Sequence, residues 1–421
     1  MSDRRERRSP STRLVIVALA ALTSGCTDLL GVTELTGVDA AVEASTSSTK
    51  KDGGRDATAS SASSTSRTGT GTGSGPSSSS SSSSMSDSAS SGASTSGSGA
   101  SSASSSTFTM CSPSNCAGTC TTTGCLVTLA SGLSDPTAVA IDSQNVYWID
   151  NGGGGVMKVP IGGGATTTLA PQGQGPNVPS DSIAVDGTSV YWVQPGASGS
   201  ATSGIVGSVG TAGGDAGAFA ALQNTPYAIA VDAQNVYWVD YLPTNAGTVM
   251  KQPLTGFRVA TALATGVIDP NWIAVDDTNV YYNSSISLLT VPIGGGTPLT
   301  FSAKSQPIAI ALEGANVYWV TNNQTVLTAP KTGGGMPVTL AGATAVSGPY
   351  AIAADAENVY WTNNTGGTVM KVAVTGGAPI TLVTGEVGAW GIAIDANSVY
   401  FTVNNASGHS GQGTVMKLTP K

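Results

Sequence analysis

Between residues 126 and 421, short segments of alternating apolar and polar residues recur in a fixed order. Each unit contains an Ile-Ala-Val-Asp segment such as residues 229–232, then a Val-Tyr-Trp segment, then a Gly-Thr-Val-Met-Lys segment such as residues 247–251, then a short apolar segment such as residues 339–341. The segments are rich in β-branched and aromatic residues and are separated by Gly, Asn, Asp and Pro, which is typical of strands joined by turns. The pattern therefore predicts four β-strands per unit and needs no amphipathic helix.

The number of units follows from the second predicted strand, because the dipeptide Val-Tyr occurs once in each. Its tyrosines are Tyr147, Tyr191, Tyr237, Tyr281, Tyr318, Tyr360 and Tyr400. They lie 37 to 46 residues apart, a period typical of the blades of a β-propeller.

The ends of the repeat region predict how the ring closes. The last unit stops after its third strand, at residues 413–418, whereas a segment of the fourth-strand type, residues 126–130, precedes the first complete unit. This N-terminal strand is expected to complete the C-terminal blade, which protects its edge. The predicted fold is therefore all-β, a seven-bladed β-propeller of four-stranded blades over residues 126–421.

The segment before the propeller has a different composition. From about residue 44 to residue 107 it is almost wholly Ser, Gly, Thr and Ala, which buries too little apolar surface to form a core. Residues 26–107 are therefore predicted to be a disordered Ser/Gly/Thr/Ala tether, whose last 64 or so residues have an end-to-end distance of roughly 45 Å.

The N-terminus has the pattern of an export signal. Five arginines within the first 13 residues precede an uncharged apolar run at residues 14–22 and the sequence Thr23-Ser24-Gly25-Cys26. The apolar run is too short to span a bilayer, so residues 1–25 are interpreted as a cleaved signal peptide. Small residues that lead into a cysteine resemble the bacterial lipoprotein signal, which implies lipidation at Cys26. The alternative is ordinary cleavage nearby, with Cys26 as a spare thiol.

That resemblance also implies a location. Thr27 follows the cysteine, as in lipoproteins sorted to the outer membrane. The protein is expected to be exported and held by a lipid anchor at the outer membrane or the cell surface.

Four further cysteines follow the tether with the spacing C-x4-C-x3-C-x4-C. They are Cys111, Cys116, Cys120 and Cys125, and they define a small four-cysteine knob at residues 108–125. An even number of cysteines in an exported chain favours two disulfides, with three connectivities that stay open. A four-thiolate zinc site is the competing interpretation.

Charge and composition exclude some function classes. Lys and Arg number 17 against 25 Asp and Glu, a net charge of -8, so nucleic acid is not an expected partner. The chain has one histidine, His409, in a Gly- and Ser-rich loop, and it is interpreted as solvated. No cofactor, metal or catalytic residue is predicted.

Several units carry the pattern Tyr-Trp-x-Asp or Tyr-Trp-x-Asn. Examples are Tyr147-Trp148-Ile149-Asp150, Tyr237-Trp238-Val239-Asp240 and Tyr360-Trp361-Thr362-Asn363. The pattern resembles the YWTD propeller repeats of the low-density lipoprotein receptor family and the related NHL-type bacterial propellers. The resemblance implies the propeller fold over residues 126–421, and names no ligand.

Repeated polar residues are interpreted as scaffold. An acidic residue ends the first strand of every unit: Asp142, Asp186, Asp232, Asp276, Glu313, Asp355 and Asp395. A ring of carboxylates could hold a metal, but a side chain at the same hairpin in every unit is better explained as a cap of that turn. Lys158, Lys251, Lys371 and Lys417 recur at one strand position and are interpreted as solvated charges at blade edges.

Residues that differ from unit to unit are the candidates for binding. Where the first strands begin, at the expected mouth of the central channel, the chain carries Asp181, Tyr227, Asn271, Trp272, Tyr350 and Trp390. Aromatic surfaces with a few polar groups suit sugars or peptide side chains. The alternative is that these residues pack blade against blade.

The leading hypothesis is a non-catalytic cell-surface lipoprotein whose propeller binds a glycan, peptide or protein in adhesion or envelope interactions. The alternative is a metal-assisted hydrolase or lyase of the same fold, which would resemble the bacterial propellers that hold a metal ion on carboxylates. A purely structural envelope protein is a third possibility.

Overall fold

The computed structural model describes Ser112 and residues 116–153, 155–171, 182–196, 203–242, 246–256, 258–404 and 412–421. The predicted signal peptide, the tether, Cys26, Cys111, Asp181 and His409 lie outside the described residues. Within the described ranges every regular element is a β-strand. No helix with the length and apolarity of a membrane span occurs in this part of the chain.

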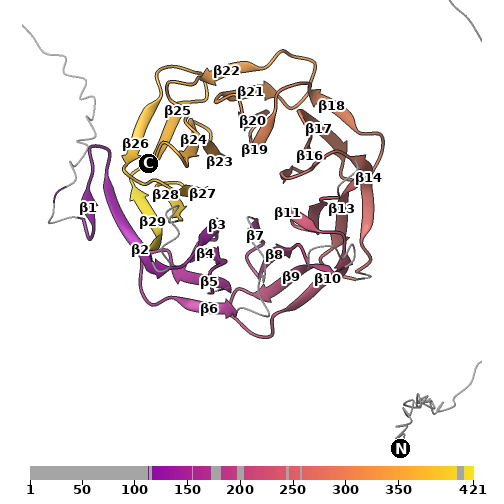
Figure 1. The fold of residues 1–421 in the computed structure, drawn as a ribbon, viewed down its shortest axis with the longest axis horizontal. Coiled ribbons are helices and arrows are strands. Elements are labelled where there is room, and N and C mark those ends of the chain that lie inside the picture. Colours follow the sequence, from indigo (N-terminus) through magenta and orange to yellow (C-terminus); the bar gives the residue numbers. More distant parts are fainter. Residues whose placement is uncertain are drawn as a thin grey trace, which may run out of the picture. The chain divides into compact units, whose positions relative to one another are not determined.

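The strands form seven sheets arranged in a ring (Figure 1), which confirms the predicted seven-bladed propeller. Blade 1 contains β3 (Pro136–Ile141), β4 (Asn145–Asp150), β5 (Gly155–Pro160) and β6 (Thr167–Ala170). Blade 2 contains β7 (Ile183–Val185), β8 (Ser189–Gln194), β9 (Gly204–Gly210) and β10 (Gly217–Gln223). Blade 3 contains β11 (Pro226–Val231), β12 (Asn235–Asp240), β13 (Gly247–Pro253) and β14 (Thr261–Val267). Blade 4 contains β15 (Ile273–Val275), β16 (Asn279–Ser284), β17 (Ser287–Pro292) and β18 (Leu299–Ser302).

The remaining blades follow the same order. Blade 5 contains β19 (Pro307–Glu313), β20 (Asn316–Thr321), β21 (Val326–Pro330) and β22 (Val338–Ala341). Blade 6 contains β23 (Pro349–Ala354), β24 (Asn358–Asn363), β25 (Thr368–Ala373) and β26 (Ile380–Thr384). Blade 7 contains β27 (Ala389–Ile394), β28 (Val399–Val403) and β29 (Gly413–Thr419), and it is completed by β1 (Thr119–Cys120) and β2 (Cys125–Leu133) from the other end of the chain. The labelled first strands β3, β7, β11, β19, β23 and β27 lie nearest the ring axis (Figure 1).

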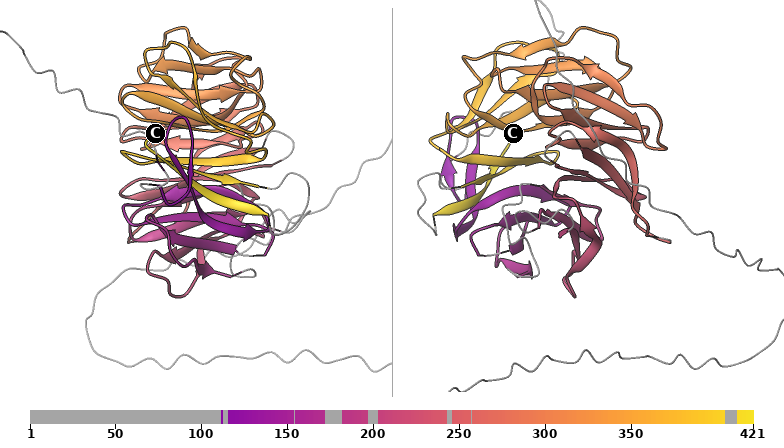
Figure 2. Two further views of the ribbon diagram at one scale, coloured as in Figure 1. Left: turned by 90° about the vertical axis from the view of Figure 1, so that its left-hand side faces the viewer. Right: turned by 45° about the vertical axis from the view of Figure 1, so that its right-hand side comes forward.

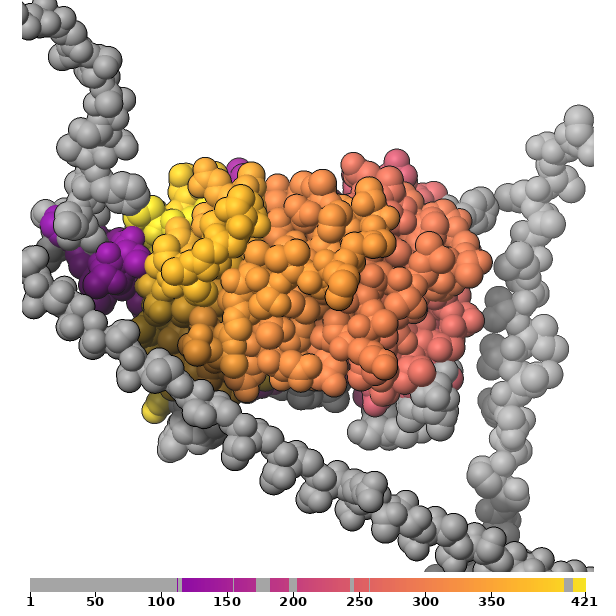
Figure 3. All heavy atoms as spheres, turned by 90° about the horizontal axis from the view of Figure 1, so that it is seen from above, coloured from indigo at the N-terminus to yellow at the C-terminus, as the bar shows by residue number. Residues whose placement is uncertain are grey.

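The ring is closed by β2, as the sequence predicted. β2 pairs antiparallel with β29, from Cys125 opposite Thr419 to Leu133 opposite Gly413. The indigo β1–β2 segment therefore lies beside the yellow C-terminal strand in the edge-on view (Figure 2, left). In the space-filling view the same segment stands out from the rim of the ring next to the yellow residues (Figure 3).

The blades are held to one another by the Tyr-Trp segment of the second strand. Because neighbouring residues of a strand point to opposite faces, the tyrosine packs toward one adjacent blade and the next aromatic residue toward the other. Tyr147 shares a buried cluster with Trp192 of the following blade, and Tyr191 shares the next cluster with Trp238. The same pairing recurs around the ring. It ends with Tyr400 and Trp148 at the interface between blade 7 and blade 1, which we call the seam. Large buried aromatic side chains at each interface thus supply much of the apolar burial.

In six blades the Asp at the end of the first strand caps the following turn, as expected, whereas Glu313 at the same place in blade 5 makes no such hydrogen bond to a described residue. In blade 3, Asp232 Oδ1 accepts the backbone N–H groups of Gln234 and Asn235 at 2.7 and 2.6 Å, and Oδ2 accepts the Tyr237 hydroxyl at 2.7 Å. These contacts repeat in blades 1, 2, 6 and 7. Hydrogen bonds of this kind favour the ionised carboxylate, and the pKa of the equivalent Asp142 and Asp395 lies below its usual value despite partial burial.

The interpretation of the repeated lysines as solvated charges is wrong for three of them. Lys158 Nζ donates to the Thr211 carbonyl at 2.6 Å, Lys251 Nζ to the Ile293 carbonyl at 2.8 Å, and Lys417 Nζ to the Ile161 carbonyl at 3.0 Å. Each carbonyl belongs to the next blade, so these ammonium groups join neighbouring blades. The sequence could not show this, because the partner is a backbone atom more than 40 residues away.

Candidate functional site

The channel mouth is built where first strands begin and second strands end. These two positions lie side by side because the strands pair antiparallel, for example Pro136 of β3 opposite Asp150 of β4. Residues from several blades therefore converge at one end of the ring, and they line a cavity of about 260 Å³. Its lining residues are Ser182, Tyr227, Ala228, Asn271, Trp272, Ile308, Asn322, Pro349 and Tyr350. We call this cavity the mouth pocket.

Aromatic rings make up much of the wall of the mouth pocket. Trp272 and Tyr350 meet edge to face, with ring centroids 6.5 Å apart. Tyr350 also contacts Trp390, with centroids 3.9 Å apart and planes 38° from parallel. Tyr227, from blade 3, is 38% exposed, and its ring centroid lies 6.3 Å from that of Tyr241. Trp272 of blade 4, Tyr350 of blade 6 and Trp390 of blade 7 thus form one line of ring contacts, and Tyr227 and Tyr241 of blade 3 form a separate pair.

Buried polar side chains fix the backbone that carries these rings. Asn283, at the end of its second strand, accepts the backbone N–H groups of Asn271 and Trp272 through Oδ1, both at 2.8 Å. In blade 6, Thr362 Oγ1 accepts the Ala351 N–H at 3.1 Å and donates to the Trp390 carbonyl at 2.7 Å. Buried hydrogen-bonded supports of this kind hold a site in one geometry.

The same capping explains the acid or amide at the end of the Tyr-Trp-x-Asp pattern. Asp150 Oδ1 accepts the backbone N–H groups of Ser134 and Asp135 at 3.1 and 2.7 Å, and Asn363 Oδ1 accepts that of Ser347 at 3.1 Å. The repeated polar residue therefore belongs to the scaffold of the mouth.

A second, smaller cavity lies along the inner strands. It measures about 110 Å³ and shares Ser182, Trp272 and Tyr350 with the mouth pocket. Trp390 also lines it, together with aliphatic residues of the first strands such as Ile229.

The mouth pocket has no charged wall. Its lining contains no carboxylate, imidazole, ammonium or guanidinium group from the described part of the chain. The polar groups are amides and hydroxyls, among them Asn322, whose side chain makes no hydrogen bond to another described residue. Since an unpaired charge is costly to desolvate, this wall favours a neutral ligand.

One buried carboxyl group is close in sequence to Tyr241, whose ring contacts Tyr227 of the mouth pocket. Asp240 is 2% exposed, immediately precedes Tyr241, and accepts the Thr248 hydroxyl at 3.2 Å. Burial raises the pKa of Asp240 to about 7. Across the described ranges, no group of three or more His, Cys, Asp and Glu side chains is arranged to hold a metal ion.

The structure brings together five of the six residues proposed at the channel mouth. Tyr227, Asn271, Trp272 and Tyr350 line the mouth pocket, Trp390 contacts Tyr350, and Asp181 lies outside the described residues. Sequence reasoning missed further pocket residues, notably Asn322 and Ser182. Asn322 directly follows a second strand. Because first and second strands pair antiparallel, the end of a second strand lies beside the start of a first strand, and this pairing could have placed Asn322 at the channel mouth.

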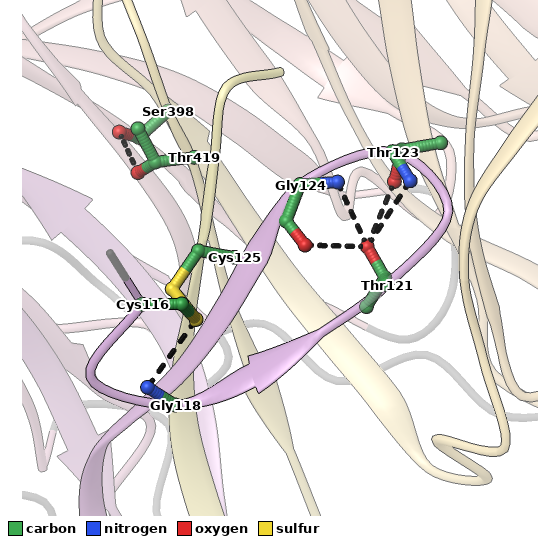
Figure 4. Close-up of a disulfide and its surroundings, with 8 residues drawn as sticks. All are labelled: Cys116, Gly118, Thr121, Thr123, Gly124, Cys125, Ser398 and Thr419. Carbon is green, nitrogen blue, oxygen red and sulfur yellow. Dashed lines mark hydrogen bonds between the residues drawn. A yellow bond between two sulfur atoms is a disulfide. The ribbon is translucent and has the colours of Figure 1, made fainter. Parts of the chain in front are cut away.

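The cysteine knob forms a short hairpin on the outside of blade 7 (Figure 4). Cys116 and Cys125 are joined by a disulfide, and Cys120 is also disulfide-bonded. At the hairpin turn, Thr121 Oγ1 donates to the Gly124 carbonyl at 2.9 Å. Thr123 Oγ1 donates to the Leu382 carbonyl of β26, also at 2.9 Å, so the hairpin is attached to blade 6.

Comparison with known proteins supports the fold. No family model matches this chain, and no curated protein matches it. A streptogramin B lyase structure is 14% identical, covers 70% of this chain and 97% of its own, and superposes with a TM-score of 0.53. A virginiamycin B lyase from Staphylococcus aureus, solved with quinupristin, is 12% identical over 70% of this chain and 98% of its own, also with a TM-score of 0.53.

A nidogen–laminin complex structure is 16% identical over 53% of this chain and 87% of its own, with a TM-score of 0.42. These identities are low, so the two lyase structures show a shared fold and nothing about activity. The TM-score of the nidogen–laminin structure is below 0.5, so no conclusion is drawn from that similarity.

Proposed function

We propose that this protein is a ligand-binding propeller that recognises a neutral sugar ring of a glycan in the mouth pocket. The observation that carries the proposal is the composition of the pocket wall, in which aromatic rings stand beside amides and hydroxyls without a charged group. A sugar presents both apolar C–H faces and hydroxyls, so rings such as Trp272 and groups such as Asn322 complement it.

The size of the pocket fits one sugar ring better than an extended ligand. About 260 Å³ is at the small end for ligand pockets, which hold drug-sized molecules. A purely apolar peptide side chain would remove water from the amides of Asn271 and Asn322 without replacing their hydrogen bonds, which disfavours it.

We also propose that the protein acts at the cell surface. The export signal, the cysteine at position 26 and the Ser/Gly-rich tether support a lipid anchor with the propeller held away from the membrane. Together these features favour a role in adhesion or envelope interactions.

The proposal is tested by probing the full mature protein on arrays of neutral glycans, charged glycans and peptides, followed by titration of the best ligand. We expect Tyr227→Ala and Asn322→Ala each to weaken binding about two- to tenfold, since one aromatic or polar contact contributes about 0.5–1.5 kcal/mol.

Met336→Ala is the matched control, because Met336 is 90% exposed and does not line the mouth pocket. Binding that responds equally to all three variants would contradict the proposed site. Selective capture of peptides would retain the site and exclude a glycan as its ligand.

A further inference from the structure

A repeated ammonium site lies at the opposite end of the inner strands from the mouth pocket, where the Asp–Tyr pairs cap the turns. In blades 3 and 7, Lys251 and Lys417 place Nζ 6.0 and 5.5 Å from the ring centroids of Tyr237 and Tyr400. Each ammonium also donates to a carbonyl of the next blade, as described above. A tyrosine face, a nearby Asp and a neighbouring carbonyl thus form an ammonium cradle.

In two other blades, the ammonium group comes from a lysine at a different position in the chain. In blade 4, Lys331 of the following blade pairs with Asp276 at 3.1 Å. In blade 6, Lys421 pairs with Asp355, and its Nζ lies 5.4 Å from the Tyr360 ring centroid. Lysines from different positions of the chain therefore bind at the cradle, which indicates that its chemistry suits a primary ammonium.

Blade 2 has the cradle without the lysine. Asp186 accepts the Tyr191 hydroxyl at 3.0 Å, as the equivalent Asp does in blades 1, 3, 6 and 7. Ser208 stands opposite Tyr191 in the strand register, where Lys158 stands opposite Tyr147 and Lys251 opposite Tyr237.

The carbonyl that such a lysine would reach is that of Leu254. Leu254 N–H bonds to the Gln234 carbonyl just as Ile293 N–H bonds to the Thr278 carbonyl, so the two positions are equivalent. No side chain of the described ranges donates to the Leu254 carbonyl.

A groove opens at this place between blades 2 and 3. It measures about 890 Å³, and Asp186, Tyr191 and Leu254 all line it. Arg258, the only arginine between residues 126 and 421, lines it as well, and its Cζ lies 5.4 Å from the Phe219 ring centroid. Arg258 forms no ion pair with a described carboxylate, so its guanidinium is available to an anion.

We propose that this groove binds a ligand that carries a primary ammonium and a carboxylate, with the ammonium in the Asp186–Tyr191–Leu254 cradle and the carboxylate at Arg258. Both charges of such a ligand are met by an opposite charge, which limits the cost of taking them out of water. This site is separate from the mouth pocket and does not depend on the function proposed there.

The test uses three probes of similar length: 6-aminohexanoate, hexylamine and hexanoate, titrated against the full mature protein by calorimetry and ligand-observed NMR. We expect 6-aminohexanoate to bind most tightly, hexylamine more weakly, and hexanoate least. Ser208→Lys should weaken 6-aminohexanoate at least roughly tenfold, since its own ammonium would occupy the cradle, whereas the matched Ser208→Ala should bind like the parent.

Two further variants keep the test decisive if Ser208→Lys fails to fold. Asp186→Asn should weaken both amines, and Arg258→Gln should weaken 6-aminohexanoate until it binds like hexylamine. The proposal is overturned if neither amine binds the parent protein, or if Ser208→Lys and Ser208→Ala bind 6-aminohexanoate equally.

Discussion

Replacing Leu133 by Ala tests whether the ring depends on its N-terminal strand. Leu133 is the last residue of β2, is 7% exposed, and packs in the cluster that joins blade 7 to blade 1. The cluster also contains Trp148 and Val415, so its residues come from both sides of the seam.

The expected loss follows from burial. A Leu→Ala change at a buried site costs about 2–5 kcal/mol, because it removes apolar contacts and leaves a cavity. For a domain of about 300 residues, an unfolding entropy of about 2.1 cal/mol/K per residue means that each kcal/mol lowers the melting temperature by about 1.6 °C, so a fall of roughly 3–8 °C is expected. Leu299→Ala is the control, since Leu299 is 63% exposed on the outer strand of blade 4 and should melt within about 2 °C of the parent.

Thermal unfolding followed by circular dichroism measures both variants. Removal of residues 126–130 should be more damaging still, because it also removes strand hydrogen bonds, each of about 0.5–1.5 kcal/mol, whereas removal of residues 27–107 should leave unfolding unchanged. If Leu133→Ala and Leu299→Ala melt at the same temperature, β2 does not stabilise the seam and the reasoning is wrong.

Three further predictions concern other parts of the chain. Tyr237→Phe removes the hydroxyl that donates to Asp232 at 2.7 Å and should cost about 1 kcal/mol in chemical denaturation, whereas Tyr318→Phe, whose hydroxyl accepts from an Asn amide and has no Asp partner, should be near neutral. Because burial raises the pKa of Asp240 to about 7 from 3.8, the folded state holds a proton that the unfolded state has lost between these values, so stability falls as the pH rises through this window. The melting temperature of Asp240→Asn should therefore fall less than that of the parent between about pH 4 and about pH 7, and an unchanged slope would refute this. Cys26→Ser should move the protein from the detergent phase to the aqueous phase in Triton X-114 partitioning, and an unchanged distribution would exclude a lipid on that residue.

The fold could be predicted from sequence because each blade repeats the same local pattern. The Val-Tyr-Trp strand, its neighbours and the unpaired strand at each end were enough to count seven blades and to assign β2 to blade 7. The assignment of one short segment as a strand is ambiguous, but the same order of strands must fit every unit, and this requirement removes the ambiguity.

The candidate site was only partly predictable for a different reason. Trp272 and Tyr350 were identified because they interrupt the repeat at a fixed position, but their contact joins blades 4 and 6 and depends on how the blades are placed in space. The lysine bonds were misjudged because the acceptor is a backbone carbonyl of another blade, which no side-chain pattern marks.

The seam has a consequence for the order in which the molecule is made. Thr128 of β2 and Met416 of β29 are hydrogen-bonded across 288 positions of the chain. During synthesis β2 is therefore made long before β29, and the edge that faces β29 has no partner until that strand has been made. Contacts this distant in sequence form slowly, and a waiting strand edge can pair with another chain. A variant that lacks β29, from Gly413 onward, would leave the edges of β2 and β28 unpaired and expose every newly made copy to aggregation.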